Sequence, residues 1–98
     1  MTYEQSLRLD FIDWRLAKCG EVQRADISRA FNGSTSQASI DLNEFLRLYP
    51  NAMTYDKTAK RYVPAGKSYV AQRNMDNPNI RRAISLLAAE GHPLGWKD

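Results

Sequence analysis

Residues 32–45 read Asn-Gly-Ser-Thr-Ser-Gln-Ala-Ser-Ile-Asp-Leu-Asn-Glu-Phe, and this stretch decides the fold. It begins with a strong turn signal, in which Gly33 is expected to supply the positive φ that closes a preceding helix. Ser34 and Gln37 then have the spacing of a capping box, with Ser34 capping the helix and Gln37 reaching back to it. A tight turn followed by a capped helix is therefore predicted.

The helix that follows is expected from about Thr35 to Leu48, because Pro50 stops it. Its apolar side chains recur at helical spacing and should form the inner face, which comprises Ala38, Leu42, Phe45 and Tyr49. The polar side chains between them are then left on the outer face. Asp41 is expected to be structural, pairing with Arg24 or Arg29.

Two helices are predicted before the turn, a long one over residues 4–18 that ends near Gly20 and a short one over residues 24–31. The long helix carries two apolar stripes on roughly opposite sides. One comprises Leu7, Phe11 and Trp14, and the other Leu9, Ile12 and Leu16. A surface helix needs only one apolar face, so this helix is buried either by its own chain or by a second copy.

The spacing of the hydrophobic residues changes after the helix expected from Thr35 to Leu48. Residues 52–55 and 61–64 are short aromatic-containing runs separated by a polar segment, which predicts a β-hairpin with a basic tip. Residues 65–76 are expected to be irregular. Asn77 and Pro78 then suit the start of a last helix over about residues 78–90, with Ile80, Ile84 and Leu87 on one face.

The predicted fold class is therefore mainly α with a small β-hairpin, a winged helix-turn-helix plus a C-terminal helix. Residues 1–66 are expected to form the winged helix-turn-helix DNA-binding domain. Residues 67–98 form a C-terminal extension that is a candidate dimerisation element.

The positive charge of the chain is concentrated in one segment, although the formal net charge is only +3. Residues 1–53 carry six Lys or Arg against seven Asp or Glu, and residues 74–98 carry three of each sign. Residues 54–73 hold five basic side chains against one acidic side chain. A local basic patch is typical of phosphate contact, and the alternative is a solvated loop.

Several classes of function are disfavoured by composition. The sequence contains no apolar run of about 18 residues and no secretory signal pattern, so a cytoplasmic protein without membrane contact is expected. Cys19 is the one cysteine and His92 the one histidine, so neither an internal disulfide nor a metal cluster can be assembled. No nucleophile–His–carboxylate set and no Gly-rich phosphate loop is present, so we expect no enzyme and no cofactor.

Residues 34–45 resemble the recognition-helix signature of winged helix-turn-helix regulators of the DeoR type, Ser-x-x-Thr-Val-x-x-Asp-Leu-Asn-x-Leu. Residues 8–16, together with residues 36–39 and 55–57, look like the N-terminal domain of WYL-domain repressors that control phage-defence islands, the CapW and BrxR group. The resemblance covers about residues 5–64. Those proteins continue into a WYL domain, so ligand sensing is not carried over, and this chain is expected to be either free-standing or an excised DNA-binding domain.

The resemblance implies a bacterial or phage transcriptional regulator, a repressor that binds double-stranded DNA. One such domain contacts only about a half-site, so binding as a homodimer to an inverted repeat is expected. The expected DNA-binding residues are Arg24, Thr35, Ser36, Gln37, Ser39, Ile40, Asn43, Lys57, Lys60 and Arg61. Gln37 is expected either to pair with adenine or to serve only in the capping box. The expected dimerisation residues are Leu9, Ile12, Leu16, Ile80, Ile84 and Leu87. The alternative function is a winged-helix module for protein contacts, an adaptor or antirepressor.

Overall fold

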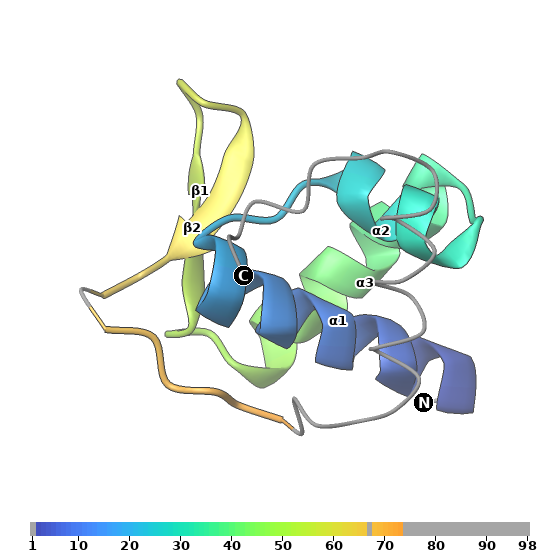
Figure 1. The fold of residues 1–98 in the computed structure, drawn as a ribbon, viewed down its shortest axis with the longest axis horizontal. Helices are drawn as coiled ribbons and strands as arrows, with labels where there is room; N and C mark the ends of the chain where they lie inside the picture. The colour runs from blue at the N-terminus through green and yellow to red at the C-terminus, as the bar shows by residue number, and fades with distance from the viewer. Residues whose placement is uncertain (1, 67, 74–98) are drawn as a thin grey trace.

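In the computed structural model, which describes residues 2–66 and 68–73, a group of helices encloses the core and a hairpin extends from it (Figure 1). The elements are α1 (Tyr3–Cys19), α2 (Arg24–Phe31), α3 (Thr35–Leu48), β1 (Met53–Asp56) and β2 (Arg61–Pro64). This is the predicted winged helix-turn-helix arrangement, mainly α with a small hairpin as the wing. The last predicted helix, with Ile80, Ile84 and Leu87, lies outside the described residues.

α1 is the central helix of the core. Its first turn is capped by the Thr2 hydroxyl, which accepts from the Gln5 N–H, and it ends at Gly20 in the left-handed conformation (φ 74°). All of residues 9–16 are buried, on both sides of the helix. Both apolar stripes are thus covered within this one chain except at Leu7, which is half-buried.

The stripe expected to contact a second copy is part of the core. Leu9, Ile12 and Leu16 are at most 1% exposed and pack in one cluster with Phe45. Of the two alternatives for α1, the structure has the one in which the helix is buried by its own chain. A partner subunit could reach these side chains only by opening that core.

The turn between α2 and α3 is closed by a different residue from the one expected. Asn32 takes the left-handed conformation (φ 52°) as the C-cap of α2, and Gly33 does not have a positive φ. Asn adopts this region more readily than other side-chain-bearing residues, so the turn forms one position earlier than predicted. The Ser28 hydroxyl then donates to the Gly33 carbonyl at 2.5 Å and fixes the chain entering α3.

The wing is a short antiparallel hairpin attached to the core. Its register pairs Met53 with Pro64 and Asp56 with Arg61, and the Asp56 carboxylate accepts two backbone N–H groups inside the turn. Val22, in the link before α2, exchanges both backbone hydrogen bonds with Tyr62 at 3.0 and 2.9 Å. The wing is therefore fixed to the start of the helix-turn-helix as well as to the end of α3.

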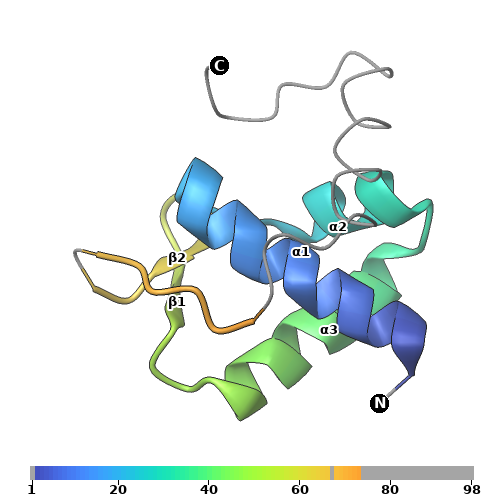
Figure 2. The same cartoon turned by 60° about the horizontal axis from the view of Figure 1, so that its bottom comes forward.

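The chain after the wing runs along α1. Residues 69–73, which we call the strap, lie beside α1 near the C-terminal end of α3 (Figures 1 and 2). The strap has no regular secondary structure, as expected for this part of residues 65–76. Burial and a hydrogen bond to Asp13 raise the pKa of Tyr69 above its ordinary value, so its hydroxyl stays protonated and donates.

Candidate nucleic-acid interface

The outer face of α3 is set by the side chains that hold its inner face. Ala38, Leu42 and Phe45 are at most 1% exposed, and the helical repeat therefore turns the opposite side away from the core. Three hydroxyls, one amide and one apolar side chain are found there, exposed or half-buried. They belong to Thr35, Ser36, Ser39, Asn43 and Ile40. Ile40 is 55% exposed.

Gln37 lies on the flank of α3 that faces α1. Its backbone N–H donates to the Ser34 hydroxyl at 3.0 Å, so the capping role of Ser34 is confirmed. Its side chain does not reach back to complete the capping box. The side-chain amide nitrogen instead donates to Asp41 Oδ1 at 3.2 Å, because a buried carboxylate one turn away is a stronger acceptor than solvent.

Asp41 ties α3 to α1 and not to α2. The predicted pairing of Asp41 with Arg24 or Arg29 is wrong, since Arg8 Nε of α1 lies 2.5 Å from Asp41 Oδ2. The Asp41 side chain is fully buried, and the guanidinium is 18% exposed. A carboxylate in this position must be paired, and Arg8 is the cation that the packing of α1 on α3 brings within reach.

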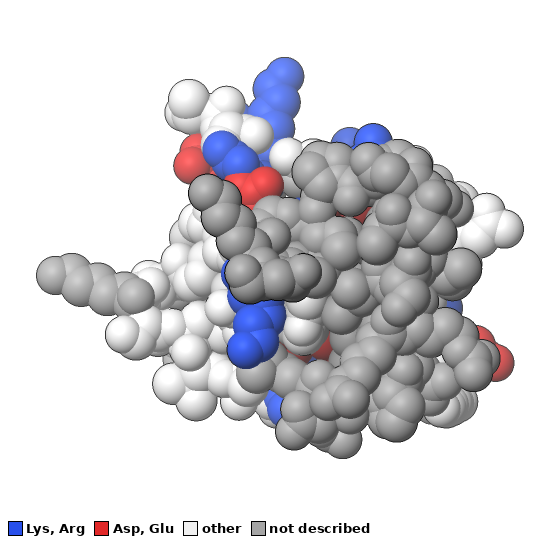
Figure 3. All heavy atoms as spheres, in the orientation of Figure 1, with Lys and Arg blue, Asp and Glu red and all other residues white. Residues whose placement is uncertain are grey.

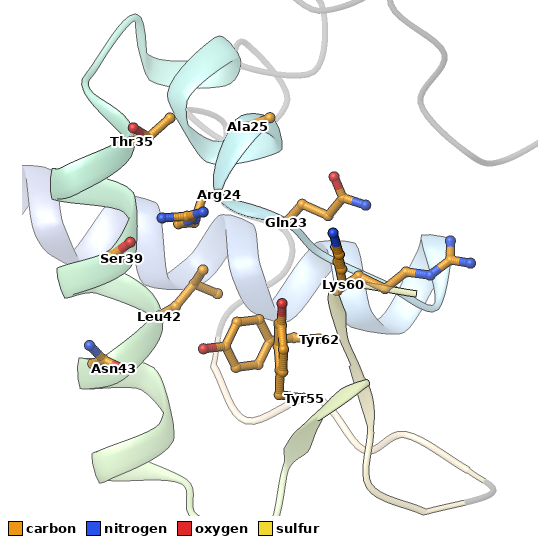
Figure 4. Close-up of a pocket in the computed structure, with 11 residues that line it drawn as sticks. Gln23, Arg24, Ala25, Thr35, Ser39, Leu42, Asn43, Tyr55, Lys60 and Tyr62 are labelled. Atoms are coloured by element: carbon orange, nitrogen blue, oxygen red, sulfur yellow. The ribbon is translucent and has the colours of Figure 1, made fainter. Parts of the chain in front are cut away.

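A pocket of about 430 Å³ lies between α3, the start of α2 and the wing (Figure 4). One wall of the pocket is formed by three successive turns of α3, with Thr35, Ser39 and Asn43. The wing contributes Tyr55, Lys60 and Tyr62. The remaining lining residues are Gln23, Arg24, Ala25, Leu42 and Arg61. The helix-turn-helix and the wing thus converge on a single concave surface, to which both polar and apolar side chains contribute.

The cations of this surface differ in how they are paired. Arg24, Lys57 and Lys60 are exposed, and no acidic group lies within 4 Å of them among the residues that the structure describes. Arg61 is different, because its guanidinium forms an ion pair with Glu21, and both side chains are about a third exposed. Basic and acidic side chains accordingly lie next to each other over the hairpin (Figure 3).

Sequence reasoning missed the aromatic pair of the wing. Tyr55 and Tyr62 face each other in the hairpin register, with ring centroids 4.9 Å apart, and both line the pocket. Tyr55 is 46% exposed. One tyrosine in each predicted strand was the available signal, but the register that makes them partners depends on the length of the turn.

Within residues 2–66 and 68–73, no three His, Cys, Asp or Glu side chains are grouped as metal ligands, and no helix is long and apolar enough to span a membrane. Burial raises the pKa of the Cys19 thiol, which disfavours the reactive thiolate. His92 lies outside the described residues.

Comparison with known sequences identifies the same architecture. Residues 4–81 match the family described as "BrxR transcriptional regulator winged helix-turn-helix domain". The match includes α1 from its second residue, all the other helices and strands described above, and the strap.

Individual relatives carry the name "DNA-binding transcriptional repressor CapW". The protein from Pseudomonas aeruginosa is 33% identical over 100 positions, which cover 95% of this chain and 33% of the relative. The protein from Escherichia coli (strain KTE188) is 40% identical over 58 residues, or 59% of this chain and 19% of the relative. The one from Stenotrophomonas maltophilia is 37% identical over 59 residues, or 60% and 20%. The matched part of this chain thus spans only a fifth to a third of their length.

Proposed function

Because the chain belongs to the family of BrxR transcriptional regulator winged helix-turn-helix domains, we propose that it binds specific sites in double-stranded DNA and regulates transcription. The name of the relatives supports repression as the direction of that regulation. The observation that carries the proposal is the convergence of exposed cations and the outer face of α3 on one pocket. Such a regulator would act in the bacterial cytoplasm, where the DNA is.

In the proposed complex α3 enters the major groove with its outer face toward the base edges. Ser36, Ser39 and Asn43 supply hydrogen-bonding groups, and Ile40 supplies an apolar contact for a thymine methyl group. Arg24 and Lys60, on either side of the pocket, are placed for the phosphates that border the groove. Lys57 at the wing tip adds a further backbone contact.

Dimeric binding to an inverted repeat forms part of the proposal. One recognition helix covers only about a half-site, and helix-turn-helix proteins commonly bind as two-fold dimers. Because Leu9, Ile12 and Leu16 are inside the core, a dimer contact on this chain would have to use other residues. Ile80, Ile84 and Leu87 remain the candidates.

An electrophoretic mobility shift on the region upstream of its own gene, together with selection from random duplexes, tests the proposal. We expect a specific shift that a competing non-specific duplex does not abolish. Light scattering of the complex gives the number of chains per site. Failure to bind any duplex at low salt would favour the alternative function, a module for protein contacts.

Removing the wing charges should weaken binding to every sequence alike. Each phosphate contact contributes about −0.9 to the slope of log affinity against log salt. Lys57→Gln and Lys60→Gln together are therefore expected to flatten that slope by about 1.8 in a fluorescence anisotropy titration. Lys18→Gln, which removes one charge on α1 outside the pocket, is the control for each of the two single substitutions and should leave most of the slope. An unchanged slope in the double variant would remove the wing from the interface.

Glu21→Gln is expected to increase DNA affinity. Glu21 holds the Arg61 guanidinium in the free protein, so a phosphate has to compete with it. Freeing Arg61 adds one cation and should steepen the salt slope by about 0.9. Arg61→Gln should change little in the native background and should abolish the gain in the Glu21→Gln background. A loss of affinity in Glu21→Gln would mean that Glu21 instead holds Arg61 ready for the phosphate.

A further inference from the structure

The strap is held on α1 by a carboxylate with no exposure to solvent. Asp13 Oδ1 accepts from the Tyr69 hydroxyl at 2.6 Å and from the Gln72 N–H at 3.0 Å. Asp13 Oδ2 accepts from the Arg73 N–H at 2.6 Å. Two backbone donors and one side-chain donor thus fix an irregular segment to one buried side chain, a geometry that specifies the path of the chain.

Arg73 at the end of the strap joins three points of the molecule. Its Nε donates to Asp10 Oδ1 at 2.6 Å and its Nη2 to the Ser6 hydroxyl at 2.7 Å, both on α1. Its Nη1 donates to the Tyr49 hydroxyl at 3.0 Å. Burial lowers the pKa of Arg73, but the hydrogen bonds to Asp10 and Tyr49 outweigh it and raise the pKa overall. The guanidinium is therefore charged, and each of its three nitrogens donates to a partner.

Tyr49 is the C-cap of α3. Its N–H donates to the Phe45 carbonyl at 2.8 Å, and its ring lies 5.0 Å from the ring of Phe45 in the core. α3 is accordingly fastened to α1 by two polar clamps, Asp41 with Arg8 in its first half and Tyr49 with Arg73 at its end. The second clamp uses a residue from the strap, which lies beyond the wing in the sequence.

We propose that the strap positions α3 for DNA, with Arg73 as a positioning residue that acts through Tyr49 and touches no DNA itself. The proposal rests on the proposed function, because it concerns the same recognition helix. A helix that reads base edges has to hold its side chains within fractions of an ångström, and a pre-organised helix binds more tightly than one that must be ordered on binding. Whatever follows residue 73 is then linked to α3 by a side chain as well as by the main chain.

Tyr49→Phe is the decisive variant, since it removes only the hydroxyl and keeps the ring on Phe45. We expect its affinity for the selected DNA site to fall about three- to tenfold, the effect of one hydrogen bond. Affinity for a random duplex and the salt slope should not change, because no phosphate contact is lost. In an Arg73→Lys background, which loses the three-point geometry, Tyr49→Phe should have no further effect.

Tyr69→Phe is the matched control, because it removes a hydroxyl bound to Asp13 and leaves the hydrogen bond between Arg73 and Tyr49 in place. Equal losses of affinity in the two variants would show a general loosening and overturn the proposal, as would an unchanged affinity in Tyr49→Phe or an equal loss on random DNA.

Amide hydrogen exchange of residues 45–49 gives a second readout without DNA. Faster exchange in Tyr49→Phe than in Tyr69→Phe is expected even if the native protein bound no DNA, in which case the proposed function alone would fail. Unchanged amide exchange in Tyr49→Phe would overturn the proposal that the strap positions α3.

Discussion

Asp41→Ala is expected to destabilise the protein by about 3 kcal/mol, the lower end of the cost of breaking a buried ion pair, because Arg8 keeps 18% exposure. The variant leaves the Arg8 guanidinium without its carboxylate and frees the Gln37 amide. For a domain of this size the loss corresponds to a fall in Tm of roughly 12–24 °C. Urea and thermal unfolding followed by circular dichroism measure both quantities.

Glu44→Ala is the matched control on the same helix. Glu44 pairs with Arg47, whose side chain is 69% exposed, so its loss should cost at most about 0.5 kcal/mol. Alanine favours a helix at both positions, which makes the difference between the two variants attributable to burial of the pair. Replacing both partners, as Arg8→Met with Asp41→Leu, should recover most of the stability. A loss below 1 kcal/mol in Asp41→Ala would show that the first clamp of α3 is not needed for folding.

The elements of this fold could be predicted because their signals are local. Ser34 caps the helix that it precedes, Pro50 follows the end of α3, and the apolar spacing of Ala38, Leu42 and Phe45 fixes the buried side. The bounds of α3 follow from these signals. The turn after α2 shows the limit of such local signals. Asn32 and Gly33 can both adopt the left-handed conformation, and packing decides that Asn32 does so.

Contacts between distant residues could not be predicted. Nothing near Asp41 in the sequence indicates Arg8, 33 positions earlier, and the irregular strap has no period that would place it on α1. The same limit applies to the interface. The outer face of α3 follows once the inner face is known, whereas the pairing of Arg61 depends on Glu21, 40 residues away. Charge counts alone therefore overstate the cations that the wing offers to a ligand.

Asn43→Ala is expected to have the largest effect on sequence preference. Asn43 is exposed on the outer face of α3 and lines the pocket beside the wing. An Asn side chain can donate to N7 and accept from N6 of adenine with paired hydrogen bonds, which discriminates against the wrong base by about 1–3 kcal/mol. We expect the preference for one A·T pair of the selected site to fall by roughly 5- to 150-fold. Binding of all single-base variants of that site, measured in competition, tests this.

Gln37→Ala provides the comparison. The Gln37 amide could also pair with adenine, but the side chain lies on the flank of α3 that faces α1. One N–H of its amide is already donated to Asp41, so base contact would require the side chain to turn away from a buried carboxylate. The change in preference should therefore be smaller than for Asn43→Ala, and Lys60→Gln should weaken every variant of the site alike. If Gln37→Ala relaxed one position more than Asn43→Ala did, the base-reading face of α3 would be the flank next to α1. DNA would then approach the domain from that side and not over the pocket.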